Sequence, residues 1–429
     1  MSADDPSSDP TREQDPESDA PESGEGSSDR EGLRAALRRL VGASKLERLL
    51  VSVMALVLAV LIGIVFVFVS GFFVPPDACT NPFLATSLGT FCYDPFNVFF
   101  FLIVGAVQSP FSVALTLQAT TFLVFTGLSV AVSFRAGLFN IGTQGQMVVG
   151  ALAAGLAGPA LVSVVSPGLV GGAVVIVGTT VAAGVAGGLY GAVPGVLKAY
   201  ADANEVITTI MLNIIASGVA FTIVSEYVNP GGNIQTEPLP RWAMLTPILA
   251  PQGSRFSIVV LLAALASAAG IYYLLNYSTF GYNVRVSGLQ PGAADYSGVD
   301  ARRVIVTTMT LSGMLGGLAG AVFVLTAQGY WTDGLPAYGF DGITVSVLAM
   351  NSPVGVVPAG LLFGVLKSGA ISFQTSSVVD VPPQLVDVLR GIIVLLVAMP
   401  EFVRMIAVRS GIRPSSSGPA PDREVTADD

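Results

Sequence analysis

The chain has 429 residues, of which 52% are hydrophobic and only 11% are charged, whereas about a quarter of the residues of a typical soluble domain are charged. This composition excludes an ordinary soluble protein and predicts a polytopic protein in a lipid bilayer. With no histidine and two cysteines, the sequence excludes His-metal sites, Ser-His and Cys-His nucleophile pairs, thiolate zinc sites and iron–sulfur centres. We therefore expect no metal site.

Most of the net charge of −9 comes from the first 30 residues, which hold ten acidic and two basic side chains. A segment with almost no apolar side chains cannot bury a core, so residues 1–33 are predicted to be a disordered acidic tail in the cytoplasm. They lack the basic start and apolar core of a signal peptide, so the first span is expected to be retained. Residues 34–408 are the predicted transmembrane domain, and residues 409–429 a second cytoplasmic tail.

A basic cluster precedes the first apolar run, residues 49–73, and places the N-terminus inside. Residues 74–97 are too polar to span the membrane and are expected to form an outer loop. There Cys79 and Cys92 either form a disulfide or remain free thiols. Residues 98–107 are apolar but short, which favours an interfacial or re-entrant helix.

Longer apolar segments then cross the membrane in alternating directions. The expected crossings are residues 111–134, 145–165, 168–197, 206–228, 257–276, 304–327, 356–372 and 385–408. A shorter piece, residues 343–350, precedes Asn-Ser-Pro and suggests a half-length crossing beside a water-filled cavity. Counting it gives ten elements with both termini in the cytoplasm, and eight or nine full spans is the alternative. Glycines spaced four apart in residues 184–195 and 313–320 predict close helix contacts.

The sequence gives little support for catalysis. No P-loop is present, because the only Lys followed by Ser or Thr is Lys367, which Leu366 precedes. We find no pair of carboxylates in mid-span of the kind that a proton-coupled carrier uses. The chain is therefore expected not to be an enzyme and to bind no cofactor, with energy supplied by another subunit.

Three polar segments interrupt the apolar pattern. In residues 134–146 neutral hydrogen-bonding side chains suggest a path for a polar, uncharged solute, although a cytoplasmic turn with glycines is the alternative; they are Asn140, Thr143, Gln144 and Gln146. In residues 203–213, Asn204 and Thr208 share one helical face and Asn213 follows, although Asn204 also suits a helix cap. The third segment is a long inner loop, residues 279–303, with a short helix expected from 291 to 297.

The joint order of these segments resembles the permease subunits of ABC importers in the branched-chain amino acid, simple-sugar and nucleoside group. The resemblance runs from about residue 49 to 408, and Phe-Asn-Ile-Gly at residues 139–142 with Asn-Glu-Val-Ile at 204–207 is most similar to the larger permease of nucleoside importers. It implies an all-α fold like that of type II ABC importers, with about eight to ten transmembrane helices and at least one broken or half-length span. It also implies a second permease, two cytoplasmic ATPase subunits that use the ATP, and an outer solute-binding lipoprotein.

By the same resemblance, residues 279–303 are the coupling segment that docks into the ATPase. The residues carried over to this role are Arg285, Gly288, Pro291, Ala294, Tyr296 and Gly298. Where the family often has Glu-Asn-Pro-Glu, this chain has Leu-Gln-Pro-Gly at residues 289–292, so both acids are missing. Tyr296 either anchors the docked helix in a groove of the partner or lies at headgroup level as an interfacial aromatic.

The resulting hypothesis is a cell-membrane permease that imports a nucleoside, with a purine nucleoside preferred, by alternating access driven by partner ATPases. Amides and hydroxyls suit such a path because they satisfy sugar hydroxyls and base edges without the desolvation cost of a charge. Phe134 or Phe139 would offer aromatic contacts to a base. Two alternatives stay open: a simple-sugar (ribose-like) ABC permease, and an ion-coupled secondary transporter or channel that needs no ATPase. No nucleic-acid partner is expected.

Overall fold

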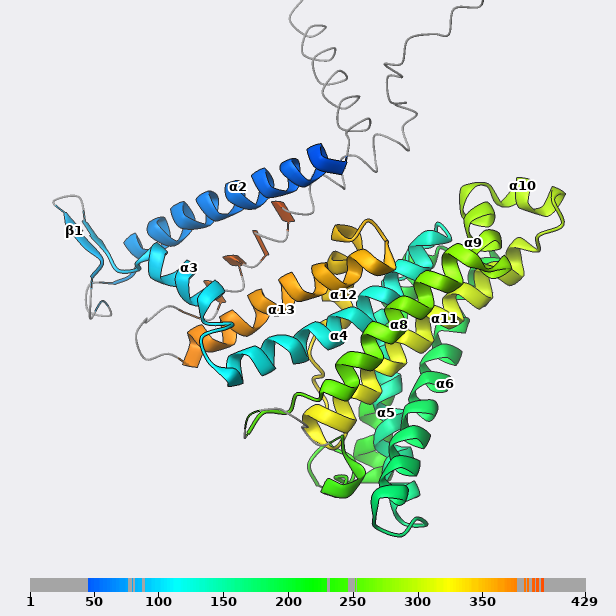
Figure 1. Ribbon diagram of the computed structural model, residues 1–429. Coiled ribbons are helices and arrows are strands. Elements are labelled where there is room, and N and C mark those ends of the chain that lie inside the picture. Colours follow the sequence, from blue (N-terminus) through cyan, green and yellow to red (C-terminus); the bar gives the residue numbers. More distant parts are fainter. Residues whose placement is uncertain are drawn as a thin grey trace, which may run out of the picture. The chain divides into compact units, whose positions relative to one another are not determined.

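Helices make up about three quarters of the chain that the computed structural model describes (Figure 1). The described residues are 45–75, 79, 82–86, 89–229, 232–245, 251 and 253–375, with single residues or pairs between 382 and 396. Two units are distinguished, Leu49–Phe402 and the two ends Met1–Arg48 with Val403–Asp429. The predicted tails and most of the predicted crossing at residues 385–408 lie outside the described residues.

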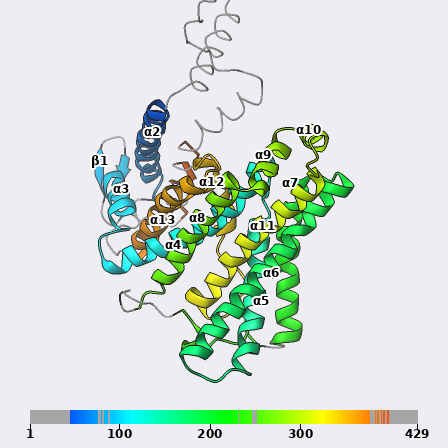
Figure 2. The ribbon, with the colours of Figure 1, turned by 45° about the vertical axis from the view of Figure 1, so that its right-hand side comes forward.

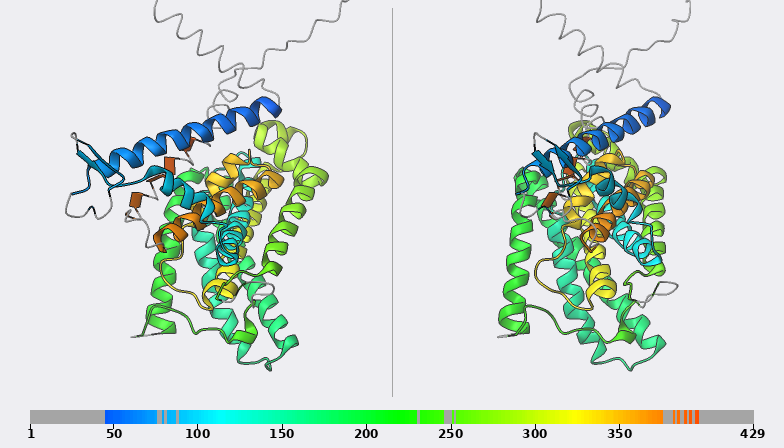
Figure 3. Two further views of the ribbon diagram at one scale, coloured as in Figure 1. Left: turned by 60° about the vertical axis from the view of Figure 1, so that its left-hand side comes forward. Right: turned by 90° about the vertical axis from the view of Figure 1, so that its left-hand side faces the viewer.

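The first elements form a helix with a small hairpin at its end. Helix α2 (Lys45–Phe72) is followed by strands β1 (Leu84–Thr86) and β2 (Gly89–Phe91), which pair antiparallel with Leu84 opposite Phe91. Phe91 stacks on Phe68 of α2 at a centroid distance of 4.1 Å, which holds the hairpin against the helix (Figure 3). Helix α3 (Pro95–Val104) then begins at a Pro, and Asp94 caps it by accepting from the backbone N–H of Phe96.

Seven helices of the described residues are long and apolar enough to cross a membrane. They are α4 (Pro110–Arg135), α5 (Thr143–Val162), α6 (Leu169–Ala201), α7 (Glu205–Ile223), α8 (Ile258–Tyr277), α11 (Ala301–Val322) and α13 (Pro353–Thr375). The crossings expected from residue 111 to 372 are thus confirmed as helices, with ends shifted by a few residues. The last turns of two of them widen into π-helix, at η2 (Val224–Val228) and η4 (Phe323–Gln328). The chain is an all-α, multi-pass membrane protein.

Helix α12 (Tyr338–Leu348) is the expected half-length element. Its first residue stacks on Phe122, the thirteenth of the 26 residues of α4, with ring centroids 4.7 Å apart. Just beyond its other end, the carbonyl of Asn351 accepts a hydrogen bond of 3.0 Å from Arg135, the last residue of α4. Helix α12 therefore covers only one half of the length of α4.

One expectation for the inner loop was incomplete. Residues 279–289, predicted as loop, form helix α9 (Thr279–Leu289), and only the following α10 (Pro291–Tyr296) was expected. Ser278 caps α9 by accepting from the backbone N–H of Gly281 at 3.2 Å. No proline interrupts the segment before Pro291, so nothing prevents the helix from forming.

Helix α11 lies at the centre of the long helices, beside α6 in both views (Figures 1 and 2). Glycine makes the contact possible: a Cβ on Gly317 would lie 2.3 Å from the carbonyl oxygen of Ala183, and one on Gly187 would lie 2.5 Å from that of Gly313. On the side of α11 that faces α5, a Cβ on Gly320 would lie 2.3 Å from the carbonyl oxygen of Met147. The predicted small-residue faces thus set the packing of α5, α6 and α11.

Two loops, one before α8 and one before α12, are joined to each other by backbone hydrogen bonds. The N–H of Thr236 donates to the carbonyl of Trp331 at 3.0 Å, and that of Leu239 donates to the carbonyl of Gly329 at 2.8 Å. The hydroxyl of Thr236 also accepts from the N–H of Trp331, whose side chain is buried. The loops before α8 and before α12 therefore form one connected surface.

Candidate functional site

A pair of amides is buried where the chain passes from α4 into α5. Asn140 and Gln146 are 0% and 1% exposed, and their side chains pair with each other through bonds of 3.1 and 3.3 Å. Asn140 also donates to the hydroxyl of Ser312 on α11 at 2.7 Å and accepts from the N–H of Gly142 at 2.9 Å. Gly137, at φ +71°, supplies the turn that brings this segment back into the bundle.

Three hydroxyl side chains, one each from α4, α5 and α11, lie next to this pair of amides. Ser129 donates to the backbone carbonyl of Ser312 at 2.7 Å, and Ser312 donates to that of Ser129 at 2.6 Å. The hydroxyl of Thr143 lies 3.1 Å from that of Ser129. We call Ser129, Asn140, Thr143, Gln146 and Ser312 the polar core.

Asn213, on the neighbouring helix α7, caps the start of α5. Gly142, at the N-cap position of α5, has no side chain to cap the helix. Asn213 of α7 supplies the missing acceptor, because its Oδ1 accepts from the N–H of Gly145 at 2.7 Å, and its Nδ2 donates to the carbonyl of Ile141 at 3.0 Å. A Cβ at Gly145 would lie 2.9 Å from that Oδ1, so the contact requires glycine.

Gln144 links the start of α5 to the start of α12. Its Oε1 accepts from the N–H of Gly339 at 2.8 Å, and its Nε2 donates to the carbonyl of Pro336 at 3.3 Å. The side chain is 8% exposed. Gln144 therefore holds the half-length helix against α5.

Asn204 and Thr208 lie apart from this cluster, at the beginning of α7. The Oδ1 of Asn204 accepts from the N–H groups of Val206 and Ile207 at 3.0 and 3.3 Å, which is helix capping. The hydroxyl of Thr208 donates to the backbone of its own helix. The structure thus brings together five of the seven residues predicted for the path, all with hydrogen-bond partners inside the chain. Their role in solute passage stays a prediction.

The aromatic residues suggested for base contacts pack on each other. The rings of Phe134 and Phe139 are 4.9 Å apart, and both side chains are half-buried.

Sequence reasoning missed two other groups of residues. Ser129 and Ser312 were overlooked because single serines in apolar helices carry no sequence signal until their partners are known. An ion pair between Asp341 of α12 and Lys367 of α13 was also missed. Lys367 stands alone among apolar residues of a predicted span, and such a charge is itself the signal that could have found the pair.

The segment predicted to couple to an ATPase consists of α9 and α10, beside the start of α11 (Figures 1 and 2). Leu289 and Tyr296 are 87% and 97% exposed, so their side chains project from this surface. The other carried-over residues shape the segment. Arg285 donates to the backbone carbonyl of Leu275, and Gly288 packs against the backbone at Arg135. Ala294 is buried, Pro291 begins α10 and Gly298 has φ +80°.

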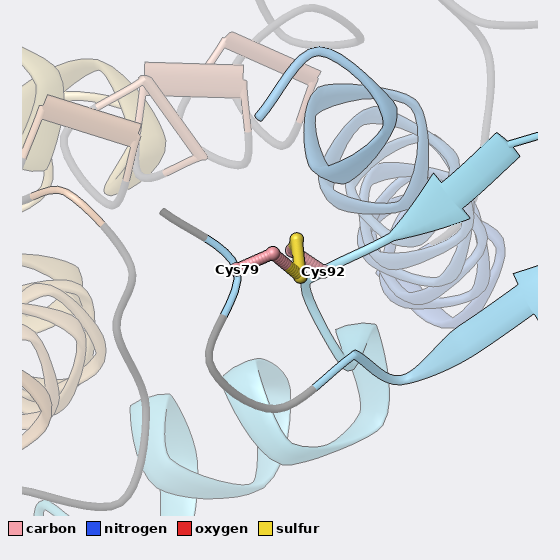
Figure 4. The surroundings of a disulfide bond; sticks show 2 residues. All are labelled: Cys79 and Cys92. Carbon is pink, nitrogen blue, oxygen red and sulfur yellow. A yellow bond between two sulfur atoms is a disulfide. The ribbon is translucent and has the colours of Figure 1, made fainter. Parts of the chain in front are cut away.

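Cys79 and Cys92 are joined by a disulfide, with their Cα atoms 5.7 Å apart (Figure 4). The bond ties the loop after α2 to the residue that follows β2. The N–H of Cys92 in turn donates to the carbonyl of Gly71 in α2 at 3.1 Å. Of the two states left open by the sequence, the structure has the bonded one.

Comparison with known proteins shows that this chain is similar to permease subunits of transporters. A family model described as the permease component of branched-chain amino acid transport systems matches residues 111–398. A guanosine ABC transporter permease protein of Bacillus subtilis is 35% identical over 68% of this chain and 82% of its own length. A nucleoside ABC transporter permease protein of Lactococcus lactis is 30% identical over 82% of this chain and 93% of its own length. A glucose ABC transporter permease protein of Haloferax volcanii is 29% identical over 73% of this chain and 83% of its own length.

Proposed function

This chain belongs to the family of permease components of branched-chain amino acid transport systems, and we propose that it is the membrane subunit of an ABC importer that carries nucleosides into the cell. The similarity to the guanosine permease, which extends over 82% of that protein, carries the proposal. The nucleoside permease from Lactococcus supports the same solute class over 93% of its length. Purine nucleosides are the preferred solutes because the relative with the higher identity is described as a guanosine permease.

The partners follow from this role. Two cytoplasmic ATPase subunits bind and hydrolyse the ATP, and one of them docks on α9 and α10. The exposure of Tyr296 and Leu289 supports that docking surface, because aromatic and apolar side chains dominate the centres of such interfaces. A second permease pairs with this chain in the membrane, and an outer lipoprotein delivers the solute. The chain binds no cofactor of its own.

The orientation belongs to the same proposal. The bases Arg135 and Lys198 lie at the ends of α4 and α6, and Arg302 and Arg303 lie at the start of α11. By the positive-inside rule these positions support a cytoplasmic location of those ends. The outer loops with the disulfide then face the other side. Both termini are cytoplasmic, with residues 1–33 and 409–429 as tails around a transmembrane domain of residues 34–408.

Uptake of radiolabelled guanosine tests the proposal, in cells that express this chain with its neighbouring subunits. Uptake that disappears with an inactive ATPase partner and ignores excess ribose is the expected result. Uptake that ribose or glucose suppresses would assign the solute to sugars, the alternative that the glucose permease of Haloferax favours. Uptake that survives the inactive ATPase would contradict an ABC importer and favour an ion-coupled transporter.

A further inference from the structure

An ion pair lies between the half-length helix α12 and helix α13. The ammonium of Lys367 contacts the Oδ2 of Asp341, and it also lies 4.0 Å from the centroid of the Tyr338 ring. That ring is stacked on Phe122 of α4. An acid, a base and two aromatic rings from three helices therefore meet at one place.

This place is near the middle of α4, one of the helices long and apolar enough to cross the membrane. Phe122 is the thirteenth of the 26 residues of α4, and a Cβ on Gly342, next to Asp341, would lie 2.7 Å from the hydroxyl of Thr126 one turn further along. The 26 residues of α4 span about 39 Å, so the ion pair lies roughly 20 Å from either end of that helix. Solute sites of many transporters lie at this depth, beside helices that are interrupted.

The pair is not fully covered by the chain. The side chains of Lys367 and Asp341 are 17% and 24% exposed. Charged groups in a membrane face the protein interior or a water-filled cavity, since contact with lipid tails is expensive. We therefore expect the uncovered part of the pair to face the aqueous path or a partner that lines it.

The chemistry of the pair suits a neutral solute that carries hydroxyl groups. A carboxylate accepts hydrogen bonds from two hydroxyls and an ammonium donates up to three, while the pair as a whole has no net charge. Because both side chains of the pair are partly exposed, they can form charge-assisted hydrogen bonds with the hydroxyls of a solute on that exposed side.

We propose that Asp341 and Lys367 form a subsite that binds the sugar hydroxyls of the solute on its way through the membrane. Tyr338 positions the ammonium by a cation–π contact and is in turn held by Phe122. This inference rests on the proposed function for the identity of the solute, but its chemistry applies to nucleosides and simple sugars alike.

Three variants separate solute binding from a purely structural ion pair. Asp341→Asn or Lys367→Gln alone leaves one charge without its partner and is expected to lower the amount of folded protein. The double variant D341N/K367Q removes both charges and keeps similar shapes, so it is expected to restore the amount of protein in the membrane. Uptake by the double variant should nevertheless require a guanosine concentration about tenfold higher or more for half-saturation, because the charge-assisted hydrogen bonds are lost.

Lys198→Gln is the matched control. Lys198 also forms ion pairs, with Asp202 at 3.5 Å and Glu205 at 3.4 Å, but at the end of α6 that we place in the cytoplasm. Its loss should leave the half-saturating concentration unchanged. A double variant D341N/K367Q that matches the wild-type half-saturation would show that the pair serves folding alone and would overturn the proposal.

A second measurement uses the unmodified protein and does not depend on any variant folding. The chain has only three lysines, Lys45, Lys198 and Lys367, so acetylation by acetic anhydride can be followed at each of them by mass spectrometry. In the assembled transporter, saturating guanosine should reduce acetylation of Lys367 relative to that of Lys198. Acetylation of Lys367 that guanosine does not change, or that never occurs, would contradict a solute site reached by water.

The two proposals fail in different ways. If the wild-type transporter moves glucose or ribose but not guanosine, the nucleoside assignment is wrong, and protection of Lys367 by that sugar still supports the subsite. If guanosine is imported and Lys367 is not protected, the subsite is wrong and the nucleoside assignment stands.

Discussion

At the scale of single residues, the polar core shows how a membrane helix can begin inside the bundle without leaving polar atoms unpaired. Asn140 and Gln146 satisfy each other, and Ser312 takes the remaining donor of Asn140. Asn213 then binds the N–H of Gly145 from another helix. Each buried polar group left without a partner costs about 1–3 kcal/mol, so the loss of any one of these side chains destabilises the fold through the partners that it leaves unpaired.

Asn140→Ala is expected to reduce the free energy of unfolding by about 1–3 kcal/mol, because Gln146 and Ser312 lose a partner in a buried place. Denaturant unfolding of the purified protein in detergent measures this loss. Asn276→Ala is the matched control, since Asn276 donates only to the carbonyl of Tyr272 in its own helix. If both variants unfold like the wild type, the polar core does not stabilise the fold.

The same residues test the predicted path. Asn140→Ala and Asn213→Ala should lower guanosine uptake per molecule of permease in the membrane, because both side chains fix the position of the start of α5. Asn140→Ala also removes one side chain of the polar core. Uptake is normalised to the permease detected in the same membranes. Unchanged uptake at normal protein amounts would remove both residues from the path.

At the scale of elements, packing between α11 and its neighbours depends on the absence of side chains. Gly317→Leu should prevent the close approach of α6 and α11, because even a Cβ at Gly317 would lie 2.3 Å from the carbonyl oxygen of Ala183. Overpacking of this kind costs about 1–3 kcal/mol or more. The same substitution at Gly218 of α7 is the control, since within the described part of the chain no atom beyond its own stretch of helix lies within 4 Å of a Cβ built there. Thermal unfolding in detergent should separate the two variants, and equal midpoints would contradict the packing argument.

Helix α10 carries a prediction about assembly. Tyr296→Ala should weaken copurification of the ATPase subunits, because an exposed aromatic side chain at the centre of an interface contributes more than about 1 kcal/mol to binding. Tyr227→Ala is the control, since Tyr227 is also largely exposed, at 81%, but belongs to η2 at the other end of α7. Copurification that both variants retain would favour the interfacial placement of Tyr296 in the headgroup region.

The elements and their close glycine contacts were predictable from the apolar pattern and the glycine spacing, whereas the hydrogen bonds between elements were not. The crossings from α4 to α13 and the short α10 follow from hydrophobic length, proline and glycine. Helix α9 was missed because its sequence is neither apolar nor strongly periodic, and its cap at Ser278 is a local signal that was not used. One partner of Asn140 is Ser312, 172 residues further along, and no pattern in one sequence identifies such a pair.

At the scale of the whole transmembrane unit, two helices have their first residues beside the inner part of α4 and not beside its ends. Helix α5 starts at Thr143, beside Ser129, and α12 starts at Tyr338, beside Phe122. Gln144 joins the two starts through the backbone of Pro336 and Gly339. Interrupted helices at membrane depth need protein or a water-filled cavity around them, and the polar core and the ion pair lie at these two starts.

The orientation of this unit can be tested with single cysteines. The two native cysteines are bonded to each other, so they do not react with maleimides in the oxidised protein. Leu169→Cys at the start of α6, where the native side chain is 92% exposed, should react with a membrane-impermeant maleimide in intact cells, because we place this end outside.

Tyr296→Cys in α10 should react only after the membrane is permeabilised, because α10 lies on the face proposed to contact the ATPase. The ratio of labelling before and after permeabilisation measures sidedness at each position. Labelling in the reverse order would show that the permease has the opposite orientation, with α9 and α10 outside, where no ATPase could reach them. The proposed coupling surface and the assignment of both termini to the cytoplasm therefore depend on this one result.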